Sequence, residues 1–275
     1  MKNIDFKTVE SFGDEWTKFD QTKLSEIEAQ NIFNKYFNIF PWKIISKTSE
    51  GFDMGCGTGR WASFVAPKVG KLNCVDPSHA INIARLRLKK FSNIRIHDCS
   101  LDEVKLEKNS QDFGYSLGVL HHVPDTQLAI KSCVDLLKPG SPFLIYLYYS
   151  FDNRPFWFFY LWKITNYLRL IISRLPSKLK IIVTDLLAIC IYYPIAKICL
   201  FLKKININVK NFPLSFYADK TFYTMRTDSR DRFGTRLEKR FSKKEIKKMM
   251  ENAGLDNIDF SKNEPYWCAI GYKKK

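Results

Sequence analysis

The sequence lacks the features that mark secreted and zinc-binding proteins. Its seven cysteines are scattered along the chain, odd in number, and none belongs to a C-x-x-C pair. This pattern indicates free thiols in a reducing compartment and argues against both a disulfide framework and a metal site. The first residues, Met1 to Phe6, contain no apolar run of the secretory type. We therefore expect a cytoplasmic protein that holds no metal ion.

Acidic residues are scarce relative to basic ones. The 275 residues include 44 Lys and Arg but only 28 Asp and Glu, which gives a formal net charge of +16. One expectation is an anionic partner, either a nucleic acid or a membrane surface, and the other is a solvated basic face. A hydrophobic content of 45% and an aromatic content of 15% favour a packed protein over a disordered one. The length allows one domain with an elaborate insertion.

The stretch Gly51 to Gly59 is informative partly through what it lacks. It reads as a short apolar strand that ends in an acid, Asp53, followed by a glycine turn that opens a helix at Arg60. Three glycines within five residues allow positive φ angles and a close approach of the backbone to a ligand, at which the helix would point its free N–H groups. The dinucleotide fingerprint G-x-G-x-x-G is absent, because Arg60 stands where its third glycine would fall.

Two further stretches follow this turn at informative positions. Asp76 ends the next predicted strand, 19 residues after Gly57, where its carboxylate could accept hydrogen bonds from both hydroxyls of a ribose. An ordinary strand-end acid before a turn at Pro77 is the alternative. The run Asp112 to Asp125 predicts a fourth strand and a Leu-His-His loop after it.

Together these stretches resemble the class I S-adenosylmethionine-dependent methyltransferases, within them the type 11 subgroup that includes quinone-biosynthesis enzymes. The resemblance implies an α/β fold with a doubly wound, seven-stranded, Rossmann-like sheet, here with a helical, hydrophobic insertion after strand 5. It implies S-adenosyl-L-methionine as the cofactor. The residues implied to bind this cofactor are Asp53, Gly55, Cys56, Gly57, Gly59, Asp76, Pro77, Cys99, Ser100, Leu101, Leu117 and Gly118.

The residue that holds the adenine stays open within this resemblance. Related enzymes place an acid in the loop after the third strand, and Asp98, Ser100 and Asp102 compete for that place. If Ser100 occupies it, the adenine contact would be weaker or would rest on the backbone. Leu117 and Gly118 are implied to lie beside the methionine part of the cofactor.

His121 and His122 are the candidate catalytic residues. Methyl transfer from a sulfonium is an in-line displacement, which depends on a positioned nucleophile and a desolvated pocket. A base with a pKa near neutrality helps when the acceptor is a hydroxyl or an acidic carbon, and an unperturbed imidazole titrates near pH ~6.5. Both histidines follow the fourth strand, close to the expected methyl group. Either could act as the base, and a structural role is the alternative for each.

The resemblance covers two separate parts of the chain. Residues 46–150 and 241–275 form the expected cofactor-binding domain, and an S-x-x-E capping box at Ser242 predicts its last helix. Residues 1–45 are expected to form an N-terminal helical cap, in which the aromatic and acidic segment Phe12 to Phe19 could cover the cofactor pocket. Residues 151–240 form a helical insertion and an acceptor-binding segment.

The insertion is rich in apolar residues and in positive charge. Residues 156–204 predict two hydrophobic helices joined at Pro176, and the second has the length of about 20 residues that spans a bilayer. Asp185, Lys197 and Pro194 within it oppose spanning. Ten Lys and Arg against two Asp and Glu in residues 151–218 favour a peripheral membrane contact through 156–204. A helical cap packed on the core, or on a second copy of the chain, is the alternative.

The segment 215–240 is polar and aromatic and returns the chain to the final helix of the cofactor-binding domain. It should pass near the carboxyl ends of the strands, where open α/β sheets bind ligands. We expect an acceptor-binding wall, with a surface loop of paired charges as the alternative. The residues expected to contact the acceptor are Trp16, Tyr223, Arg226 and Arg232.

The sequence thus predicts S-adenosylmethionine-dependent methyl transfer to a small or lipid-linked acceptor, by an enzyme that is cytoplasmic or peripheral on the inner face of a membrane. Resemblance alone places it in glycan, lipid or quinone biosynthesis. A nucleic-acid methyltransferase is less expected, because the N-P-P-Y signature of base-amino methylation is absent. A non-catalytic, membrane-associated protein that retains the fold is the further alternative. The oligomeric state stays open.

Overall fold

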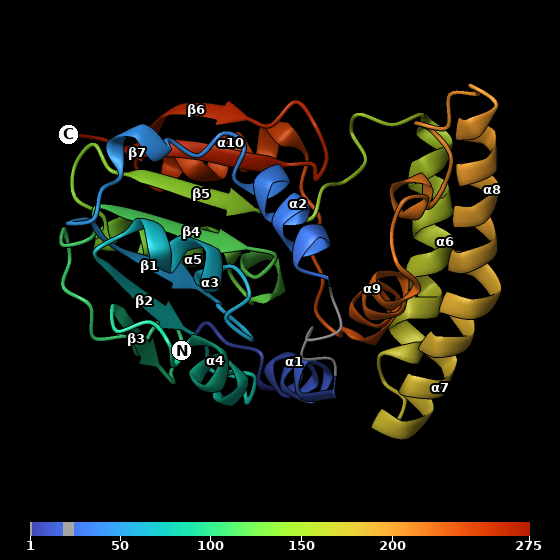
Figure 1. Ribbon diagram of the computed structural model, residues 1–275, viewed down its shortest axis with the longest axis horizontal. Helices are drawn as coiled ribbons and strands as arrows, with labels where there is room; N and C mark the ends of the chain where they lie inside the picture. Colours follow the sequence, from blue (N-terminus) through green and yellow to red (C-terminus); the bar gives the residue numbers. More distant parts are fainter. Residues whose placement is uncertain (1, 19–24) are drawn as a thin grey trace. The chain divides into compact units, whose positions relative to one another are not determined.

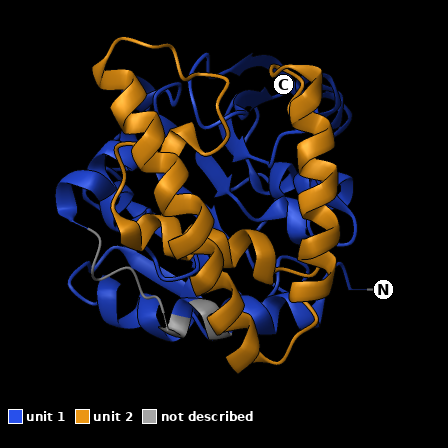
Figure 2. Cartoon of the chain, turned by 90° about the vertical axis from the view of Figure 1, so that its right-hand side faces the viewer, with its two compact units in different colours: residues 1–150, 237–275 blue, residues 151–236 orange. Residues whose placement is uncertain are grey.

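The computed structural model of the chain describes residues 2–18 and 25–275, which fold as two compact units (Figures 1 and 2). Unit 1 comprises residues 1–150 and 237–275, and unit 2 comprises residues 151–236. The return to unit 1 lies four residues before the expected boundary at 241. The reason is that Leu237 and Lys239 are hydrogen-bonded to His122 and His121 of unit 1. Residues 1–45, expected as a cap, belong to unit 1; Phe19, expected in the lid, lies outside the described residues.

Unit 1 is built on a seven-stranded sheet with the order β3-β2-β1-β4-β5-β7-β6 (Figure 1). Strands β1 to β5 pair in parallel, and β7 runs antiparallel to both of its neighbours. This order confirms the doubly wound sheet expected from the sequence. The strands are β1 (Glu50–Met54), β2 (Lys71–Val75), β3 (Ile94–His97), β4 (Phe113–Leu117), β5 (Pro142–Tyr146), β6 (Leu255–Phe260) and β7 (Cys268–Lys273).

Helices cover both faces of this sheet, so it has two hydrophobic cores. One core contains side chains of α5 and α10, and the other contains side chains of α2, α3 and α4. Helix α10 begins with the predicted capping box, in which Ser242 and Glu245 bond each other's backbone N–H groups. The α-helices of unit 1 are α1 (Phe6–Lys18), α2 (Glu26–Tyr36), α3 (Ala62–Val65), α4 (Ile81–Leu88), α5 (Thr126–Leu136) and α10 (Lys243–Asn252), and the 3-10 helices are η1 (Trp42–Ile44), η2 (Ala66–Lys68) and η3 (Leu120–His122).

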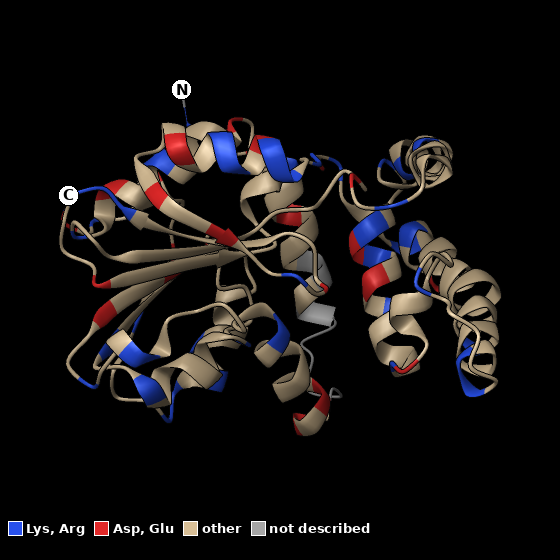
Figure 3. Ribbon diagram, turned by 90° about the horizontal axis from the view of Figure 1, so that it is seen from above, with Lys and Arg blue, Asp and Glu red and all other residues tan. Residues whose placement is uncertain are grey.

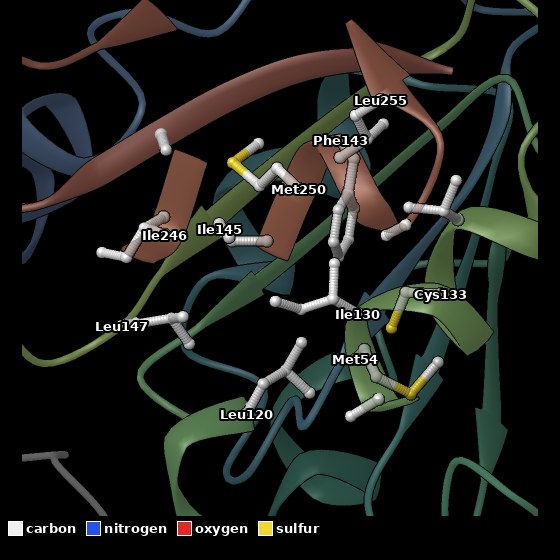
Figure 4. Packing of buried hydrophobic residues seen from close by; sticks show 14 of the residues in the cluster. Met54, Leu120, Ile130, Cys133, Phe143, Ile145, Leu147, Ile246, Met250 and Leu255 are labelled. Atoms are coloured by element: carbon white, nitrogen blue, oxygen red, sulfur yellow. The ribbon is translucent and has the colours of Figure 1, made fainter. Parts of the chain in front are cut away.

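Strand β5 shows why the central strands have near-continuous apolar sequences. Phe143 and Ile145 pack in the core under α5 and α10, as Figure 4 shows, whereas Leu144 packs in the core on the other face. Successive side chains of a strand point to opposite faces, so a strand that is covered on both sides needs an apolar residue at every position.

Unit 2 consists of helices. These are α6 (Phe156–Ile172), α7 (Ser177–Leu187), the π-helical segment η4 (Ala188–Tyr192), α8 (Tyr193–Lys204), the 3-10 helix η5 (Ser215–Tyr217) and α9 (Phe222–Gly234). The two hydrophobic helices expected from the sequence are α6 and the continuous stretch Ser177–Lys204, with Pro176 between them. Helix α9 packs against α6, α7 and η4. A small core formed by Ile172, Tyr192, Ala196, Met225 and Phe233 holds these helices together.

Strands β1 and β4 fit together through a reciprocal exchange of glycine and phenylalanine. In their register Gly51 lies opposite Phe113, and Phe52 lies opposite Gly114. A Cβ atom added to Gly51 would lie 2.4 Å from the Phe113 ring, and one added to Gly114 would lie 2.2 Å from the Phe52 ring. Each glycine therefore makes room for the aromatic ring on the neighbouring strand.

Gly114→Ala should destabilise unit 1 by roughly 1–3 kcal/mol, the usual cost of overpacking a core. Urea unfolding of the single variants Gly114→Ala and Phe52→Leu, and of the double variant, measures this cost. Because leucine removes the ring atom nearest to the new methyl group, the double variant should lose less stability than the two single variants added together. Additive losses would show that the clash is not between these two side chains.

Candidate active site

The glycine turn after β1 has the backbone conformation expected of it. Gly55, Gly57 and Gly59 have φ angles of 80°, 53° and 72°, a region that L side chains rarely adopt. A Cβ atom on Gly55 would meet Val119 at 2.5 Å and one on Gly59 would meet Leu88 at 2.7 Å, whereas one on Gly57 would have no neighbour within 4 Å. Gly57 therefore leaves the backbone open on the side from which a ligand could approach.

The helix after this turn differs from the expectation. Arg60 lies in the turn, and the α-helical part is the four-residue α3 (Ala62–Val65), which no side chain caps and which continues as a 3-10 helix. Such a short helix contributes little macrodipole. The turn is held instead by β2, since Gly55 and Cys56 both donate their N–H groups to the Val75 carbonyl, at 2.8 and 3.0 Å.

Asp76 at the end of β2 connects the glycine turn to the next loop. Its Oδ2 accepts the Gly57 N–H at 2.8 Å, and its Oδ1 accepts the Ser78 N–H at 2.8 Å and the Ser78 hydroxyl at 2.5 Å. Burial raises the pKa of Asp76, and the bonds from Ser78 and Gly57 oppose that rise. Pro77 is exposed between these two residues. The carboxylate is thus fixed beside the backbone that Gly57 leaves open.

Asp53 is a buried acid beside this turn. Its side chain is 2% exposed, and its Oδ2 has no hydrogen-bond partner among the described residues. Burial raises the pKa of Asp53 to about 8, the Tyr115 hydroxyl opposes this shift, and the charge of Asp76 adds to it. An unsatisfied buried carboxyl is costly, so this oxygen is suited to receive a donor or a positive charge from a ligand.

The three candidates for the adenine contact all have partners within unit 1. Asp98 forms an ion pair with Arg85 at 3.3 Å, and the Ser100 hydroxyl donates to Glu103 at 2.8 Å. Asp102 accepts the backbone N–H of Asn3 at 2.6 Å. The neighbouring Cys99 and Leu101 pack against the core that contains α5 and α10. These contacts do not select one of the three, so the alternatives stay open.

The residues after β4 bring Gly118 and the two histidines to the neighbourhood of β5. Leu117 is 9% exposed, and Gly118 has a φ angle of 79° and donates its N–H to the Tyr146 carbonyl at 3.0 Å. A Cβ atom on Gly118 would meet only Tyr146, at 3.9 Å. As at Gly57, the backbone here is open to a neighbouring group.

The two histidines have different surroundings. The His121 ring is fully buried, lies 3.9 Å from the Tyr148 ring, and neither of its nitrogens has a hydrogen-bond partner among the residues described. Burial lowers the pKa of His121 well below its usual value, with further contributions from His122 and Arg240. The Nδ1 atom of His122 lies 2.6 Å from the Leu237 carbonyl oxygen. A carbonyl only accepts, so Nδ1 carries the proton and Nε2 is the basic nitrogen of neutral His122.

Glu238 and Arg240, which follow the insertion, lie beside the cluster formed by His121, His122 and Tyr148. Neither of them was predicted as a site residue. Arg240 and Glu238 form an ion pair at 2.8 Å, with side chains that are 9% and 1% exposed. The Arg240 guanidinium lies 5.1 Å from the centre of the Tyr148 ring and also donates to the Tyr149 carbonyl. Tyr148 was also not predicted as a site residue, although its position just after a buried strand could have indicated it. Nothing in the local sequence around Glu238 and Arg240 indicates a role in the site.

The N-terminal segment is tied to the same end of the sheet. The Asn3 side chain and the Asp125 backbone exchange two hydrogen bonds, at 2.6 and 2.7 Å. Further along, the Phe12 ring lies 4.8 Å from the His122 ring, and Gly13 approaches the backbone of His79. Helix α1 therefore reaches the loops that follow β2 and β4. Trp16 on this helix is partly buried. The lid expected from Phe12 to Phe19 stays a prediction.

The other residues expected to contact the acceptor lie on α9 in unit 2. Arg226 forms a bidentate pair with Asp185 of α7, at 2.7 and 2.6 Å, and Arg232 donates to the Thr165 hydroxyl of α6 at 2.9 Å. Tyr223 is partly buried on the same helix. The contacts of Arg226 and Arg232 hold the helices of unit 2 together, and their role toward an acceptor stays a prediction. Within the described ranges, no group of three or more His, Cys, Asp or Glu could hold a metal ion.

Comparison with known proteins identifies the family. Residues 52–145 match the family described as Methyltransferase domain. The ubiquinone biosynthesis O-methyltransferase of Acinetobacter baylyi is 31% identical over 106 residues, which are 37% of this chain and 43% of that protein. Phosphoethanolamine N-methyltransferase 2 of Caenorhabditis elegans is 32% identical over 100 residues, or 35% of this chain and 23% of that protein. The chain thus spans less than half the length of these curated relatives.

A solved structure shows the same fold over most of the chain. The S-adenosylmethionine-dependent methyltransferase of Aquifex aeolicus aligns with a TM-score of 0.50 and 12% identity, over 92% of this chain and 95% of that one. The cofactor of this class is a nucleoside with a positively charged sulfonium and an amino-acid tail. The residues present fit such a group: Asp76 offers a fixed acceptor beside the open Gly57, and Asp53 holds a buried oxygen without a partner. Residues 52–145 of unit 1 are therefore a class I S-adenosylmethionine-dependent methyltransferase domain, with S-adenosylmethionine as its cofactor.

Proposed function

We propose that this chain transfers the methyl group of S-adenosylmethionine to a small or lipid-linked acceptor that carries a hydroxyl group. The observation that carries the proposal is the glycine turn braced by Asp76, with the histidine and tyrosine cluster standing after β4 and β5. When bound, the cofactor supplies the electrophilic methyl group. The protein has to hold the cofactor, position the acceptor and exclude water.

Each part of the cofactor has a residue suited to it. Asp76 would accept hydrogen bonds from the ribose hydroxyls, and its bond to Gly57 keeps its carboxylate in place before the cofactor arrives. Asp53 would take up positive charge from the methionine part, near Leu117 and Gly118. The loop 98–102 would hold the adenine through one of its three candidates or through its backbone.

His122 is the proposed base for the acceptor hydroxyl. The Leu237 carbonyl holds the proton on Nδ1, so Nε2 is the nitrogen that can accept one. His121, held neutral by its surroundings, would form an uncharged wall together with Tyr148. Such a wall suits an aromatic or lipid-linked acceptor better than a phosphate.

The cellular setting is part of the proposal. One matched relative is named for O-methylation in ubiquinone biosynthesis and another for phosphoethanolamine N-methylation, so the pathways proposed are quinone, lipid or glycan biosynthesis. We place the enzyme in the cytoplasm, peripheral to the inner face of a membrane. A nucleic-acid acceptor and a non-catalytic role are the alternatives to this proposal.

Asp76→Ala should weaken S-adenosylmethionine binding by about a hundredfold, because it removes the ribose acceptor together with the brace on Gly57. Two charge-assisted hydrogen bonds at about 1.5 kcal/mol each account for this size. Isothermal titration calorimetry measures the affinity. The matched control is Asp256→Ala, an exposed acid of β6, which should bind like the wild type. Equal affinities of the two variants for S-adenosylmethionine would show that Asp76 does not contribute to cofactor binding.

Binding of the cofactor at pH 7 should release a proton from Asp53. With a pKa of about 8, this group is mostly protonated in the free protein, and a nearby positive charge favours its ionised form. The affinity should therefore rise with pH, by at most about tenfold per unit, and level off above the Asp53 pKa. Calorimetry in buffers of different ionisation enthalpy counts the protons. In Asp53→Asn both the release and this pH dependence should vanish; an undiminished release would assign the proton elsewhere.

His122→Phe should lower the turnover number by about 10²- to 10⁴-fold, the usual contribution of a general base, while cofactor affinity stays within about twofold. His121→Phe preserves the ring against Tyr148 and removes only nitrogens without partners, so its turnover should stay close to that of the wild type. The measurement is S-adenosylhomocysteine formation with catechols, with and without a prenyl tail, and with phosphoethanolamine.

Each other pattern of results has a meaning. Loss of turnover in His121→Phe alone would make His121 the base, and loss in neither variant would exclude both histidines. Cofactor binding without product from any of the acceptors would favour the non-catalytic alternative.

A further inference from the structure

Unit 2 exposes much of its apolar surface. Among the described residues, 26 large hydrophobic side chains are exposed, and 21 of them lie in residues 151–236. Monomeric soluble proteins rarely expose continuous apolar patches of more than a few hundred Å². An exposed surface of this composition therefore calls for a partner that covers it.

The exposed side chains form stripes along the two long helical stretches. On the stretch Ser177–Lys204, Ile182, Leu186, Ile189 and Tyr193 follow each other at spacings of three or four residues, and all are exposed. On α6 the same spacing joins Ile164, Leu168 and Ile171. Such spacing places the side chains of each stretch on one face of a helix.

The inner faces of α6, α7 and η4 pack against α9, which carries several charged residues, and Cys199 of α8 packs with Val209 and Ala218. The buried residues of the long stretch are Thr184, Ala188, Tyr192, Ala196 and Cys199. The Thr184 carbonyl accepts a hydrogen bond from the Ser229 hydroxyl at 2.9 Å. The Asp185 carboxylate accepts two hydrogen bonds from the Arg226 guanidinium. Figure 3 shows the alternating acidic and basic turns of α9 beside long helical stretches with few charges. Both apolar stripes therefore face away from α9.

The contacts of the inner faces with α9 bear on how the helices could meet a membrane. The stretch Ser177–Lys204 is the one helix in the described parts of the chain that is long and apolar enough to cross a bilayer by length and composition. In a spanning position, however, all its sides would face hydrocarbon, and its contacts with the charged α9 would have to break or be carried into the bilayer. Both are costly. A stretch that keeps its inner side packed on the charged α9 and turns an apolar side outward can instead lie in the plane of the interface.

The charge of unit 2 indicates the kind of surface. Residues 151–236 contain 15 Lys and Arg but only five Asp and no Glu. Lys178 and Lys204 are exposed at the two ends of the long stretch, Lys163 is exposed on α6, and Arg174 is exposed just after the end of α6. Basic side chains that flank an apolar face are attracted by anionic lipids. The same charge opposes the packing of this face on that of a second copy.

We propose that unit 2 docks on an anionic lipid bilayer, with α6 and the stretch Ser177–Lys204 lying in the plane of the headgroups and α9 on the side away from the lipid. This contact is independent of methyl transfer. It rests on the proposed function only in its purpose, which is to bring the enzyme to a lipid-linked acceptor.

The test measures sedimentation of the full chain with vesicles. Phosphatidylcholine vesicles containing phosphatidylglycerol should bind the protein, and phosphatidylcholine alone or high salt should weaken binding by at least about tenfold. Ile189→Glu/Ile198→Glu, at positions that are 53% and 55% exposed, should weaken it to a similar degree. The matched control is Ile27→Glu/Leu86→Glu, with the same charge change at positions in unit 1 that are both 77% exposed; it should bind like the wild type.

Several results would overturn the proposal. Equal loss in both double variants would show a general effect of charge, and absence of vesicle binding at low salt would exclude the membrane. A dimer in solution that only Ile189→Glu/Ile198→Glu disrupts, without vesicle binding, would assign the face to a second copy. Resistance of the bound protein to alkaline carbonate extraction would show a spanning helix. S-adenosylmethionine binding by the same variants shows that they are folded and tests the cofactor site separately.

Discussion

The hydrogen bond between the Asp76 carboxylate and the Gly57 N–H is the constraint on which the glycine turn, the proposed cofactor site, depends. It connects the end of β2 to the turn after β1 at 2.8 Å, while three glycines with positive φ angles let that turn come close. Glycine is flexible in the unfolded chain, so the order of the turn has to come from its partners. The Val75 carbonyl and Asp76 supply it, and Ser78 fixes the orientation of Asp76 in turn. The turn is therefore held by hydrogen bonds from within the protein.

Around this brace, the buried ionisable groups are paired or held neutral. Burial keeps Asp53 and His121 in their uncharged forms at neutral pH, since it raises the pKa of an acid and lowers that of a base. Arg240 and Glu238 neutralise each other.

Unit 2 combines small apolar cores with a large exposed apolar surface. Its inner helix, α9, carries the ion pair with Asp185 and hydrogen bonds to α6 and α7, whereas its long helices turn isoleucine, leucine and aromatic side chains outward. Specific bonds inside and an apolar exterior are what a protein needs when one of its surfaces faces lipid. The two units thus differ in how much apolar surface they expose, although one chain forms both.

The sequence alone determined the class of fold, the glycine turn, the position of Asp76 and the capping box of α10. These features depend on neighbours within a βαβ unit or a single helical turn, where spacing and residue type are sufficient. It also located the insertion, because its apolar runs exceed those of the rest of the chain. Tertiary structure decided the rest. Tyr148 meets His121 across 27 residues of sequence, and Arg240 meets Tyr148 across 92. The partners of Asp98, Ser100 and Asp102 come from other segments or from the turn of the loop. Which side of the long helices is polar also depended on α9, because only packing shows that Asp185 points inward to Arg226. The local sequence shows which residue types are present, whereas contacts between distant segments determine which of them come together.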